Sequence, residues 1–398
     1  MIIEEGIGID LQKVGHANRH SVLRIIQNNK QISQIDIASV LNLSQSAVSR
    51  YSKQLIDEGY VKKAGLGIST GGRKPVFLEI NPKVGYMISV EISRTGFNYA
   101  VFDFCENMIL HKKQMLRPDS LVTELTEIIS GCIENYDEEY NHNLCGIALG
   151  VRGYLDSSTG TIIYSGALHL NNMPLKQIIE ERFQVPVFID SHTRFEAMGE
   201  MTQNPGGSMD NFVYLSVSWG MSMSGFINGA LIRGKGNAGE IGMSHLLRGA
   251  PGRLVQQYCA GSYIIEQILE NWESPDNRYL KALYPENPEE LLLAHVVKAV
   301  FDGDEFAARY VRETARNLGT MVSNVIQIFD PEEVIIGGEL SKFGDHLLIP
   351  LRESVRERLK EIRLEIQFDQ VRIRLTDLIE KSCLIGGAHR IMENELSV

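Results

Sequence analysis

Residues 33–58 read SQIDIASVLNLSQSAVSRYSKQLIDE, and this stretch predicts two helices joined by a sharp turn. Ser33 can cap the first helix, and Asp36 three residues later completes a capping box. Asn42 stands where the chain must turn, and asparagine tolerates the left-handed backbone conformation better than most residues. Ser44 can then cap the second helix. This spacing is typical of a helix-turn-helix, although a helical hairpin in an ordinary core would look similar.

The second helix of this pair has an apolar side and a polar side. Val48, Leu55 and either Tyr51 or Ser52 are predicted to face inward. The outer side carries short or flexible hydrogen-bonding groups, which suit base edges and phosphates. We therefore predict a recognition helix for double-stranded DNA. Its expected contacts are Ser44, Gln45, Ser46, Ser49, Arg50 and Lys53.

The segments around this pair complete a small domain. A helix is expected over residues 15–28, where it would close the core of the helix pair. Strands are expected over 60–63 and 76–80, where the apolar pattern changes to a period of two. Residues 1–80 are therefore predicted to form a winged helix-turn-helix domain, with mixed α and β structure.

The loop between the two strands is the predicted wing. Residues 65–75 read GLGISTGGRKP, and glycines let a backbone approach DNA closely. Arg73 and Lys74 can reach a minor groove or phosphates, so we count them as DNA-binding residues. The alternative is an exposed basic loop that makes no contact with DNA.

The distribution of charge supports this division of the chain. The net charge is −11, but residues 11–78 hold ten Lys or Arg and three acidic residues, a net +7. The remainder therefore carries −18. A basic module on an acidic body can meet phosphate while the body discourages indiscriminate binding to nucleic acid.

Composition narrows the class of protein further. A chain of 398 residues with 43% hydrophobic residues predicts two or three domains. No apolar run approaches the ~20 residues that span a bilayer, and the N-terminus does not resemble a secretion signal. The five cysteines are scattered, without a Cys-x-x-Cys pair, which argues against disulfides and indicates a cytoplasmic protein without a membrane partner.

Residues 81–398 show two runs of strands, each followed by helices, and this predicts a two-lobed α/β body. The lobes are expected at 81–198 and 199–398, with the last helix packing back on the first lobe. Expected strands are 85–92, 97–104, 108–115, 144–151, 185–189, 212–217, 226–232 and 333–336. Expected helices are 119–135, 174–183, 252–271, 287–301, 304–329, 345–360 and 379–394.

Three motifs in this body resemble a known family. They are AGEIG at 238–242, preceded by Asn228-Gly229, DPEEVIIGG at 330–338 and LIGGA at 384–388. In this order and spacing the chain resembles the repressor branch of the ROK family of sugar-dependent repressors and sugar kinases. The resemblance implies a winged helix-turn-helix followed by an actin-like sugar-kinase body of the ribonuclease H-like fold. It also implies that Glu240 accepts hydroxyl groups of a sugar between the lobes.

The phosphate loops depart from the kinase pattern of that family. Kinases of this type carry Asp-x-Gly-Gly-Thr after the first strand, whereas residues 91–95 read EISRT. A second loop, Gly-Thr-Gly-x-Gly-Gly-Gly, corresponds to SWGMSMS at 218–224. Arg94 and Trp219 would fill the space that ATP phosphates require, because close backbone approach needs glycine. We therefore expect no ATP cofactor and no enzymatic activity.

The position of the general base is also altered. The family's Asn-Asp-x-Asn motif corresponds to residues 191–194, which places His192 where the catalytic Asp should be. Histidine can act as a base, but Arg194 replaces the second Asn and changes the pocket. Arg194 can recognise a phosphate or carboxylate, or it can pair internally with Asp190 or Glu196. Asp190 is a possible displaced carboxylate, on the opposite face if it lies in a strand.

The family's structural zinc site is not expected here. That site uses a histidine after the Gly-Glu-Ile-Gly motif and a loop with three cysteines. In this chain His245 is displaced by two residues, and residues 246–256 contain no cysteine. Without thiolates a tetrahedral zinc site is not expected, so no metal is predicted. Packing by Leu246, Leu247, Leu254 and Tyr258 would have to hold this loop instead.

The sequence therefore predicts a DNA-binding transcriptional regulator of carbohydrate genes, most simply a repressor. The expected effector-binding residues are Glu240, His192, Arg194, His245 and Asp190. A homodimer on a palindromic operator is expected, because two recognition helices must read two half-sites. Two alternatives remain open at this point. One is an active sugar kinase with a DNA-binding appendage, and the other is an effector-independent DNA-binding scaffold whose body serves only for dimerisation.

Overall fold

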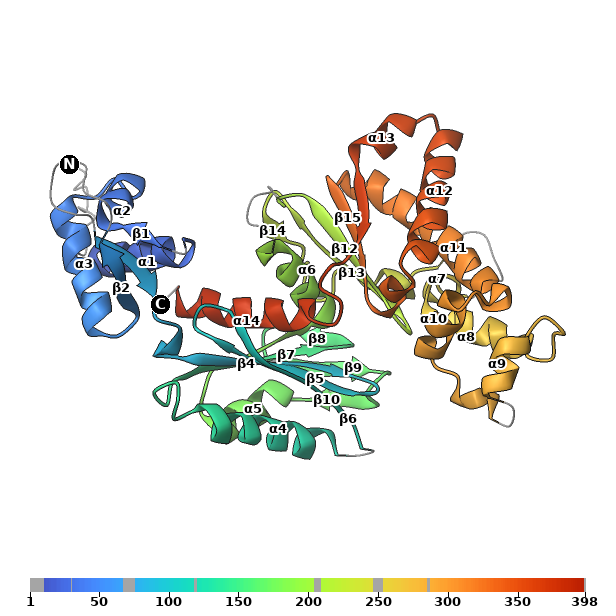
Figure 1. Ribbon diagram of the computed structural model, residues 1–398, viewed down its shortest axis with the longest axis horizontal. Coiled ribbons are helices and arrows are strands. Elements are labelled where there is room, and N and C mark those ends of the chain that lie inside the picture. The colour runs from blue at the N-terminus through green and yellow to red at the C-terminus, as the bar shows by residue number, and fades with distance from the viewer. Residues whose placement is uncertain are drawn as a thin grey trace, which may run out of the picture.

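The computed structural model describes residues 11–29, 31–66, 76–117, 120–203, 209–245, 253–284 and 287–396. A small N-terminal module lies at one end of a two-lobed body (Figure 1). The lobes are built on two five-stranded sheets with the same strand pattern, as expected for an actin-like, ribonuclease H-like body. In the part of the chain that is described, no helix is long and apolar enough to cross a membrane.

The N-terminal module is a three-helix winged helix-turn-helix, as predicted. Its strands pair in the order β1-β3-β2. Helices α1, α2 and α3 pack over this small sheet through buried Val22, Ile37, Val48 and Leu55. The helices are α1 (Leu11–Gln27), α2 (Gln34–Val40) and α3 (Gln45–Asp57), and the strands are β1 (Ile32–Ser33), β2 (Val61–Leu66) and β3 (Val76–Ile80).

Local hydrogen bonds explain where the helices of this module begin and end. Ser33 caps α2 by accepting a hydrogen bond from the Asp36 N–H, and Ser44 caps α3 by accepting from the Ala47 N–H. The second contact at α2 differs from the predicted capping box, because the Asp36 carboxylate accepts a hydrogen bond from the Ser33 hydroxyl at 2.6 Å. Asn42 turns the chain with a φ of 53°, in the left-handed region.

The first lobe is a sheet in the order β11-β7-β4-β5-β6, with β4, β5 and β6 antiparallel and β7 and β11 parallel to β4. Helices α4 and α5 lie along its lower side in Figure 1. The strands are β4 (Tyr86–Ser93), β5 (Gly96–Asp103), β6 (Met108–Met115), β7 (Leu144–Val151) and β11 (Val187–Ser191), and the helices are α4 (Leu121–Tyr136) and α5 (Leu175–Phe183).

A short meander that the sequence did not predict interrupts the first lobe. It forms a separate three-stranded sheet in the order β10-β9-β8. The strands are too short and too exposed on one side to give a strong apolar pattern, and they contribute Tyr154 and Tyr164 to the space between the lobes. Its strands are β8 (Tyr154–Asp156), β9 (Thr161–Ser165) and β10 (Leu170–Met173).

The second lobe repeats the first in its sheet, in the order β14-β13-β12-β15-β16. Long parallel helices α11 and α12 cover this sheet and bury the largest apolar cluster of the body. The strands are β12 (Phe212–Val217), β13 (Met221–Ile227), β14 (Ala230–Leu231), β15 (Glu333–Gly337) and β16 (Arg372–Leu375). The helices are α7 (Gln256–Cys259), α8 (Gly261–Glu270), α9 (Arg278–Leu283), α10 (Leu293–Phe301), α11 (Glu305–Phe329), α12 (Asp345–Glu361) and α13 (Glu365–Gln370).

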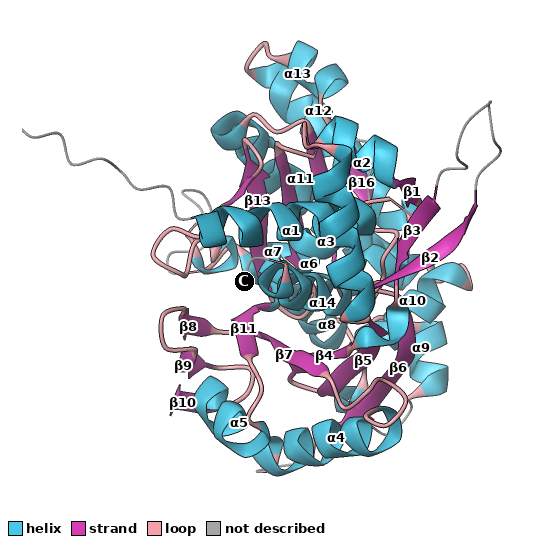
Figure 2. Ribbon diagram, turned by 90° about the vertical axis from the view of Figure 1, so that its left-hand side faces the viewer, coloured by secondary structure: helices cyan, strands magenta, loops and turns pink. Residues whose placement is uncertain are grey.

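Two helices lie side by side between the two sheets, as Figures 1 and 2 both show. They are α6 (His192–Thr202) and α14 (Ser382–Glu395). The C-terminal helix α14 packs on α6 and on β7, β4 and β5 of the first lobe, while α6 also touches β12 and β13. The boundary predicted at residue 198 falls within α6, which both lobes contact.

Some element boundaries in the second lobe differ from the prediction. The stretch 218–224 was expected to be a loop, but strand β13 already begins at Met221, so only residues 218–220 connect β12 to β13. The helix expected over 252–271 is divided at Ala260, whose extended backbone ends α7 before α8 begins. The helix expected over 287–301 begins as a single 3-10 turn and becomes α10 only at Leu293.

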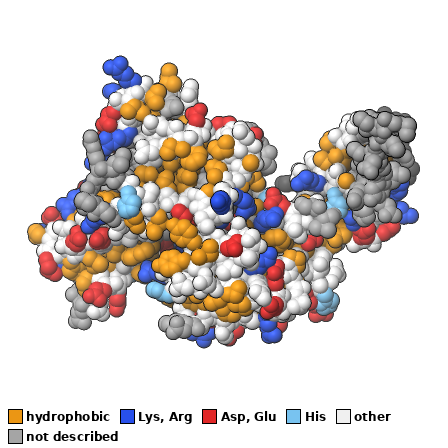
Figure 3. Space-filling view, turned by 180° about the vertical axis from the view of Figure 1, so that it is seen from behind, with side chains coloured by type: hydrophobic (Ala, Val, Ile, Leu, Met, Phe, Trp, Pro, Cys, Tyr) orange, Lys and Arg blue, Asp and Glu red, His pale blue; other side chains and the backbone are white. Residues whose placement is uncertain are grey.

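Charged and apolar side chains are interspersed over the body. The face seen from behind shows acidic and basic groups among broad hydrophobic areas (Figure 3). This mixture is ordinary for a protein surface, where much of the exposed area is apolar.

Candidate functional site

The recognition helix presents five of the predicted DNA contacts on one outer side. Val48, Tyr51, Ser52 and Leu55 of α3 are buried, so the helix is fixed in rotation. Both alternatives considered for the inner position, Tyr51 and Ser52, therefore face the core. The predicted contacts on the opposite side are all exposed, namely Gln45, Ser46, Ser49, Arg50 and Lys53.

Two of the predicted contacts also have local partners. Ser44, besides capping α3, has its hydroxyl 3.0 Å from that of Ser46. The Arg50 guanidinium lies 4.9 Å from the centre of the Tyr51 ring and donates a hydrogen bond to the Tyr51 hydroxyl at 3.1 Å. Stacking on the ring reduces the rotamers open to Arg50 before DNA arrives. Arg73 and Lys74 lie outside the described residues.

A cavity of about 1020 Å³ separates the two lobes. Its walls come from β4, β5 and the segment after β7 on one side, from β12, β13, α7 and the start of α10 on the other, and from α6 between them. Of the five predicted effector residues, Glu240 and His192 line this cavity. Asp190, Arg194 and His245 lie outside its described lining.

Glycines hold Glu240 in place at the edge of the second lobe. Gly239 has a φ of 101° and its carbonyl accepts a hydrogen bond from the Met223 N–H of β13. A Cβ at Gly239 would lie 1.9 Å from the Met223 carbonyl oxygen, so no other residue fits. Burial raises the pKa of the Glu240 carboxyl, while nearby Arg194 lowers it. The AGEIG motif thus places the partly buried carboxyl group of Glu240 at the cavity wall.

His192 begins α6 and is buried beside the cavity. Burial lowers the pKa of its imidazole well below its usual range, and nearby Arg152 and Arg194 lower it further. Its Nε2 lies 3.2 Å from the Thr193 hydroxyl, which lies 2.5 Å from the Ser222 hydroxyl. Its Nδ1 makes no hydrogen bond of good geometry among the described residues, although the backbone of Val151 interacts with the ring and raises its pKa. A neutral imidazole with a free nitrogen can hydrogen-bond a ligand.

Arg194 and Asp190 form a buried ion pair with each other. Arg194 Nε donates to Asp190 Oδ1 at 2.5 Å, and Arg233 Nη1 donates to Asp190 Oδ2 at 2.6 Å. Of the two possibilities that the sequence left open for Arg194, the structure shows the internal pair with Asp190. Since Arg233 follows β14, this carboxylate also ties the first lobe to the second, and no local sequence signal had indicated Arg233 as its partner.

The remaining predicted site residue, His245, is exposed and bridges to Leu254 in an isolated β-bridge. The donor set near it does not suit a structural zinc ion, because Cys259 is fully buried in the apolar core of the second lobe. Within the described ranges, no cluster of three or more His, Cys, Asp or Glu residues could hold a metal ion. Leu246 and Leu247, which were expected to pack in this region, lie outside those ranges.

The two altered phosphate loops meet each other across the cavity. The Arg94 guanidinium, at the β4–β5 turn, lies 4.5 Å from the centre of the Trp219 ring at the β12–β13 turn. Both side chains line the cavity. A guanidinium stacked on an indole is a favourable contact, and here it joins the two lobes. These are the two turns that correspond, in the resemblance drawn from the sequence, to the phosphate loops of the family's kinases.

Glu91, Arg152 and Glu196 are among the lining residues of this cavity that the sequence had not singled out as ligand contacts. Glu91 on β4 pairs with Arg152, which donates to it at 3.4 Å. Glu196, one helical turn after His192, had been considered only as a partner for Arg194. The helical spacing of four residues was the signal that could have placed it beside His192.

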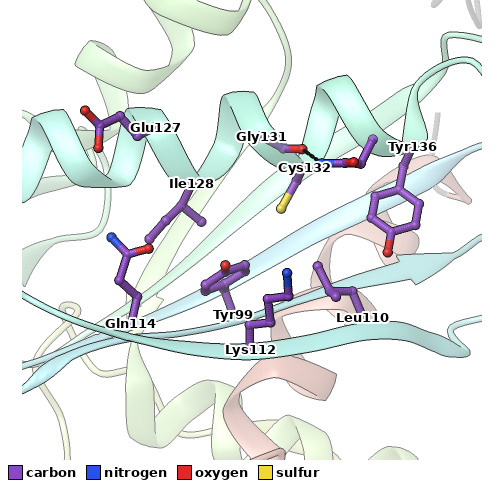
Figure 4. Close-up of a pocket in the computed structure, with 10 residues that line it drawn as sticks. Tyr99, Leu110, Lys112, Gln114, Glu127, Ile128, Gly131, Cys132 and Tyr136 are labelled. Atoms are coloured by element: carbon purple, nitrogen blue, oxygen red, sulfur yellow. Dashed lines mark hydrogen bonds between the residues drawn. The ribbon is translucent and has the colours of Figure 1, made fainter.

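A second, smaller cavity of about 420 Å³ lies between α4 and the sheet of the first lobe (Figure 4). Tyr99, Lys112 and Gln114 reach it from β5 and β6, and Ile128 and Cys132 reach it from α4. None of the predicted site residues lines it. Gln114 is the one described residue that lines both this cavity and the interlobe cavity.

The chain matches two protein-family models. Residues 16–62 match a winged helix-turn-helix DNA-binding model, and residues 87–393 match the ROK family. Among curated relatives, the xylose repressor of Caldicellulosiruptor bescii is 28% identical over 399 residues, which cover 96% of each chain. The transcriptional dual regulator NagC of Escherichia coli is 26% identical over 355 residues, covering 87% of this chain and 85% of that protein.

Solved structures agree on the fold. A ROK family transcriptional regulator described as a homologue of the E. coli MLC protein aligns with a TM-score of 0.77 at 21% identity, covering 96% of each chain. A ROK family glucokinase from Streptomyces griseus, in complex with glucose and AMPPNP, aligns with a TM-score of 0.65 at 24% identity. That alignment covers 77% of this chain and 99% of the kinase.

The module and the body together define a sugar-responsive, DNA-binding transcriptional repressor. The two-lobed body, which makes up most of the chain, matches the ROK family model. The protein belongs to the ROK family.

Proposed function

We propose that this repressor binds an unphosphorylated sugar in the interlobe cavity and does not transfer phosphate. The observation that carries the proposal is the Arg94–Trp219 stack, together with Glu240 in the same cavity. The sugar side of the cleft keeps its carboxyl group. The nucleotide side is closed by two side chains where a kinase needs bare backbone. Relatives named xylose repressor and N-acetylglucosamine repressor support a sugar of similar size as the effector.

The charges around the cavity favour a neutral ligand. Four lysine and arginine residues belong to its described lining, and each already has a partner. Arg152 pairs with Glu91, Arg94 stacks on Trp219, and both Lys113 and Lys342 pair with Glu380. A phosphate or carboxylate on the ligand would have to break one of these pairs. Hydroxyl groups, in contrast, can donate to Glu240 and contact the neutral His192 directly.

The poor fit of ATP and of the family's zinc ion to the residues present also supports a regulator that does not transfer phosphate. ATP would meet the stacked side chains, and His192 stands at the position of the catalytic base with a pKa lowered by burial. The zinc-binding thiolates of the family are missing from the sequence between residues 246 and 256. The proposal is therefore a regulator without a cofactor, in which His192, Glu240 and neighbouring groups only bind.

The DNA side of the proposal is a homodimer on a palindromic operator. One α3 can read only a few base pairs, so two copies reading half-sites about one helical turn apart are needed for a specific site. We assign base and phosphate contacts to the exposed side of α3 and to the wing. A sugar then alters DNA affinity to the extent that it binds the two lobe arrangements with different affinity.

Three measurements test this proposal. Thermal stability is measured with D-xylose, D-glucose, N-acetyl-D-glucosamine and the 6-phosphates of the last two, and the proposal predicts stabilisation by an unphosphorylated sugar. Glu240→Gln should abolish that stabilisation, and a coupled assay for ADP release should show no turnover. Stabilisation by a sugar phosphate alone, or robust turnover, would contradict it. Sedimentation analysis with and without promoter DNA tests the dimer.

A further inference from the structure

A stripe of polar residues runs along α6 on the side that faces the second lobe. His192, Glu196 and Glu200 follow one another at intervals of four residues, so they share one face of the helix. Glu200 is fully paired, since Arg374 donates to it at 3.0 Å and the Thr376 hydroxyl donates to its other oxygen. Glu196 has no such pairing, although it is equally buried.

The carboxyl group of Glu196, like the Nδ1 of His192 in the same stripe, has a buried atom that makes no hydrogen bond among the described residues. The residue is 6% exposed and lines the interlobe cavity. Among the described residues, no hydrogen-bond partner lies within reach of its Oε2. A buried polar atom left without a partner destabilises the folded state, so such atoms in native proteins call for an explanation. The cavity beside it is the available place for a partner.

The groups around Glu196 do not supply a counter-ion. Arg152, the basic group that acts on it, is already paired with Glu91. Burial raises the pKa of Glu196 to about 8 and the charge of Glu91 adds to this, while Arg152 and a side-chain hydrogen bond with Ser216 act in the opposite direction. The titratable and polar groups facing it are Glu91 on β4, Arg152 after β7, Tyr214 and Ser216 on β12, Glu200 on α6 and Cys383 on α14.

We infer that Glu196 is a ligand-binding residue whose free oxygen accepts a hydrogen bond from a hydroxyl group of the sugar. The inference rests on the proposed function, since it needs a carbohydrate in this cavity. The ligand would then be held between Glu196 on the helix that joins the lobes and Glu240 on the second lobe. One carboxyl group on each side of the ligand makes its binding sensitive to the angle between the lobes.

Proton release is the consequence that distinguishes this role from a purely structural one. In the free protein near neutral pH, Glu196 holds its proton. A hydroxyl that donates to a carboxylate favours the ionised form, so binding lowers the pKa of Glu196. A proton is therefore released when the sugar binds. Glutamine at this position cannot release one, whereas it preserves the size and shape of the side chain.

The test is calorimetric titration in two buffers of different ionisation enthalpy. The probe is whichever of D-xylose, D-glucose and N-acetyl-D-glucosamine stabilises the wild-type protein. We expect proton release by the wild type, and for Glu196→Gln an affinity about tenfold lower or weaker still, without proton release. Glu353→Gln is the matched control, because Glu353 is an exposed carboxylate on α12 that lies outside the described lining of the cavity. It should match the wild type in both respects.

The outcomes separate the two proposals. If no sugar binds the wild type, the proposed function fails and this inference fails with it. If Glu240→Gln abolishes binding while Glu196→Gln binds with unchanged affinity and unchanged proton release, only the role of Glu196 is refuted. If Glu196→Gln is unfolded by circular dichroism, Glu196→Asp replaces it. That variant keeps the carboxyl group but withdraws it from the cavity, and it should weaken binding while remaining folded.

Discussion

Replacing Asp190 with alanine should destabilise the protein far more than replacing Arg233, the more exposed of the two arginines that pair with it. Asp190 is bound by Arg194, whose side chain is 3% exposed, and by Arg233, whose side chain is 42% exposed. Without the carboxylate, Arg194 remains as a buried and uncompensated charge, which costs about 3–5 kcal/mol. Arg233→Ala removes a partly solvated partner and leaves the buried pair intact, so it should cost less than about 1 kcal/mol.

Urea denaturation followed by far-ultraviolet circular dichroism measures this difference, with the shift of the midpoint compared among variants at one pH. The double variant Asp190→Ala with Arg194→Met should recover part of the lost stability, because it removes the orphaned charge together with its former partner. Equal losses for Asp190→Ala and Arg233→Ala would refute the reasoning. Loss of sugar binding by Arg233→Ala without any change in stability would assign the cluster to ligand binding instead.

Three other predictions concern the DNA-binding helix, the cavity and the loop that carries the acidic motif. Arg50→Ala should lose about 1–3 kcal/mol of operator affinity and relax specificity at one base pair. Lys53→Ala should instead weaken binding to all DNA sequences and flatten the salt dependence of binding. Fluorescence anisotropy at several salt concentrations distinguishes the two variants. Glu196→Gln should gain stability relative to the wild type between pH 5 and pH 8 in thermal melts. Burial raises the pKa of the folded-state carboxyl from 4.5 to about 8, so wild-type stability falls as pH rises through this window. Gly239→Ala should lose stabilisation by sugar, because its Cβ meets a backbone carbonyl of β13, whereas Gly303→Ala, also at positive φ but with open space around it, should keep it.

Features set by neighbouring residues could be predicted from the sequence. The caps at Ser33 and Ser44, the left-handed turn at Asn42 and the buried face of α3 all depend on side chains a few positions apart. The body was likewise predictable as two sheets followed by helices, because its buried strands are long apolar runs. Its fold could be placed in a family because the glycines of the AGEIG motif meet backbone atoms that admit no other residue.

Features set by distant residues could not be predicted in this way. The partner of Asp190 in the second lobe is 43 positions away, and the Arg94–Trp219 stack joins turns 125 positions apart. The start of β13 at Met221 was missed because the stretch was compared with a kinase loop, whereas its residues pair with β12 and most of them are buried. Pairing with β12 makes this segment a strand, whereas the local sequence alone favours neither a strand nor a loop.

The remaining question is how the cavity communicates with the DNA-binding module, and α14 provides a physical connection. Ser382 at its start lines the cavity, and Leu396 just beyond its end belongs to the apolar cluster that contains the core of the module. Fourteen helical residues span about 21 Å, and the helix lies against both α6 and the first sheet. Tyr60 of the module packs edge-on against Phe104 of the first lobe, with ring centres 5.6 Å apart. A change in the lobe angle that shifts α6 would therefore shift α14 or open their interface, and either result would act on the apolar cluster that α14 shares with the N-terminal module.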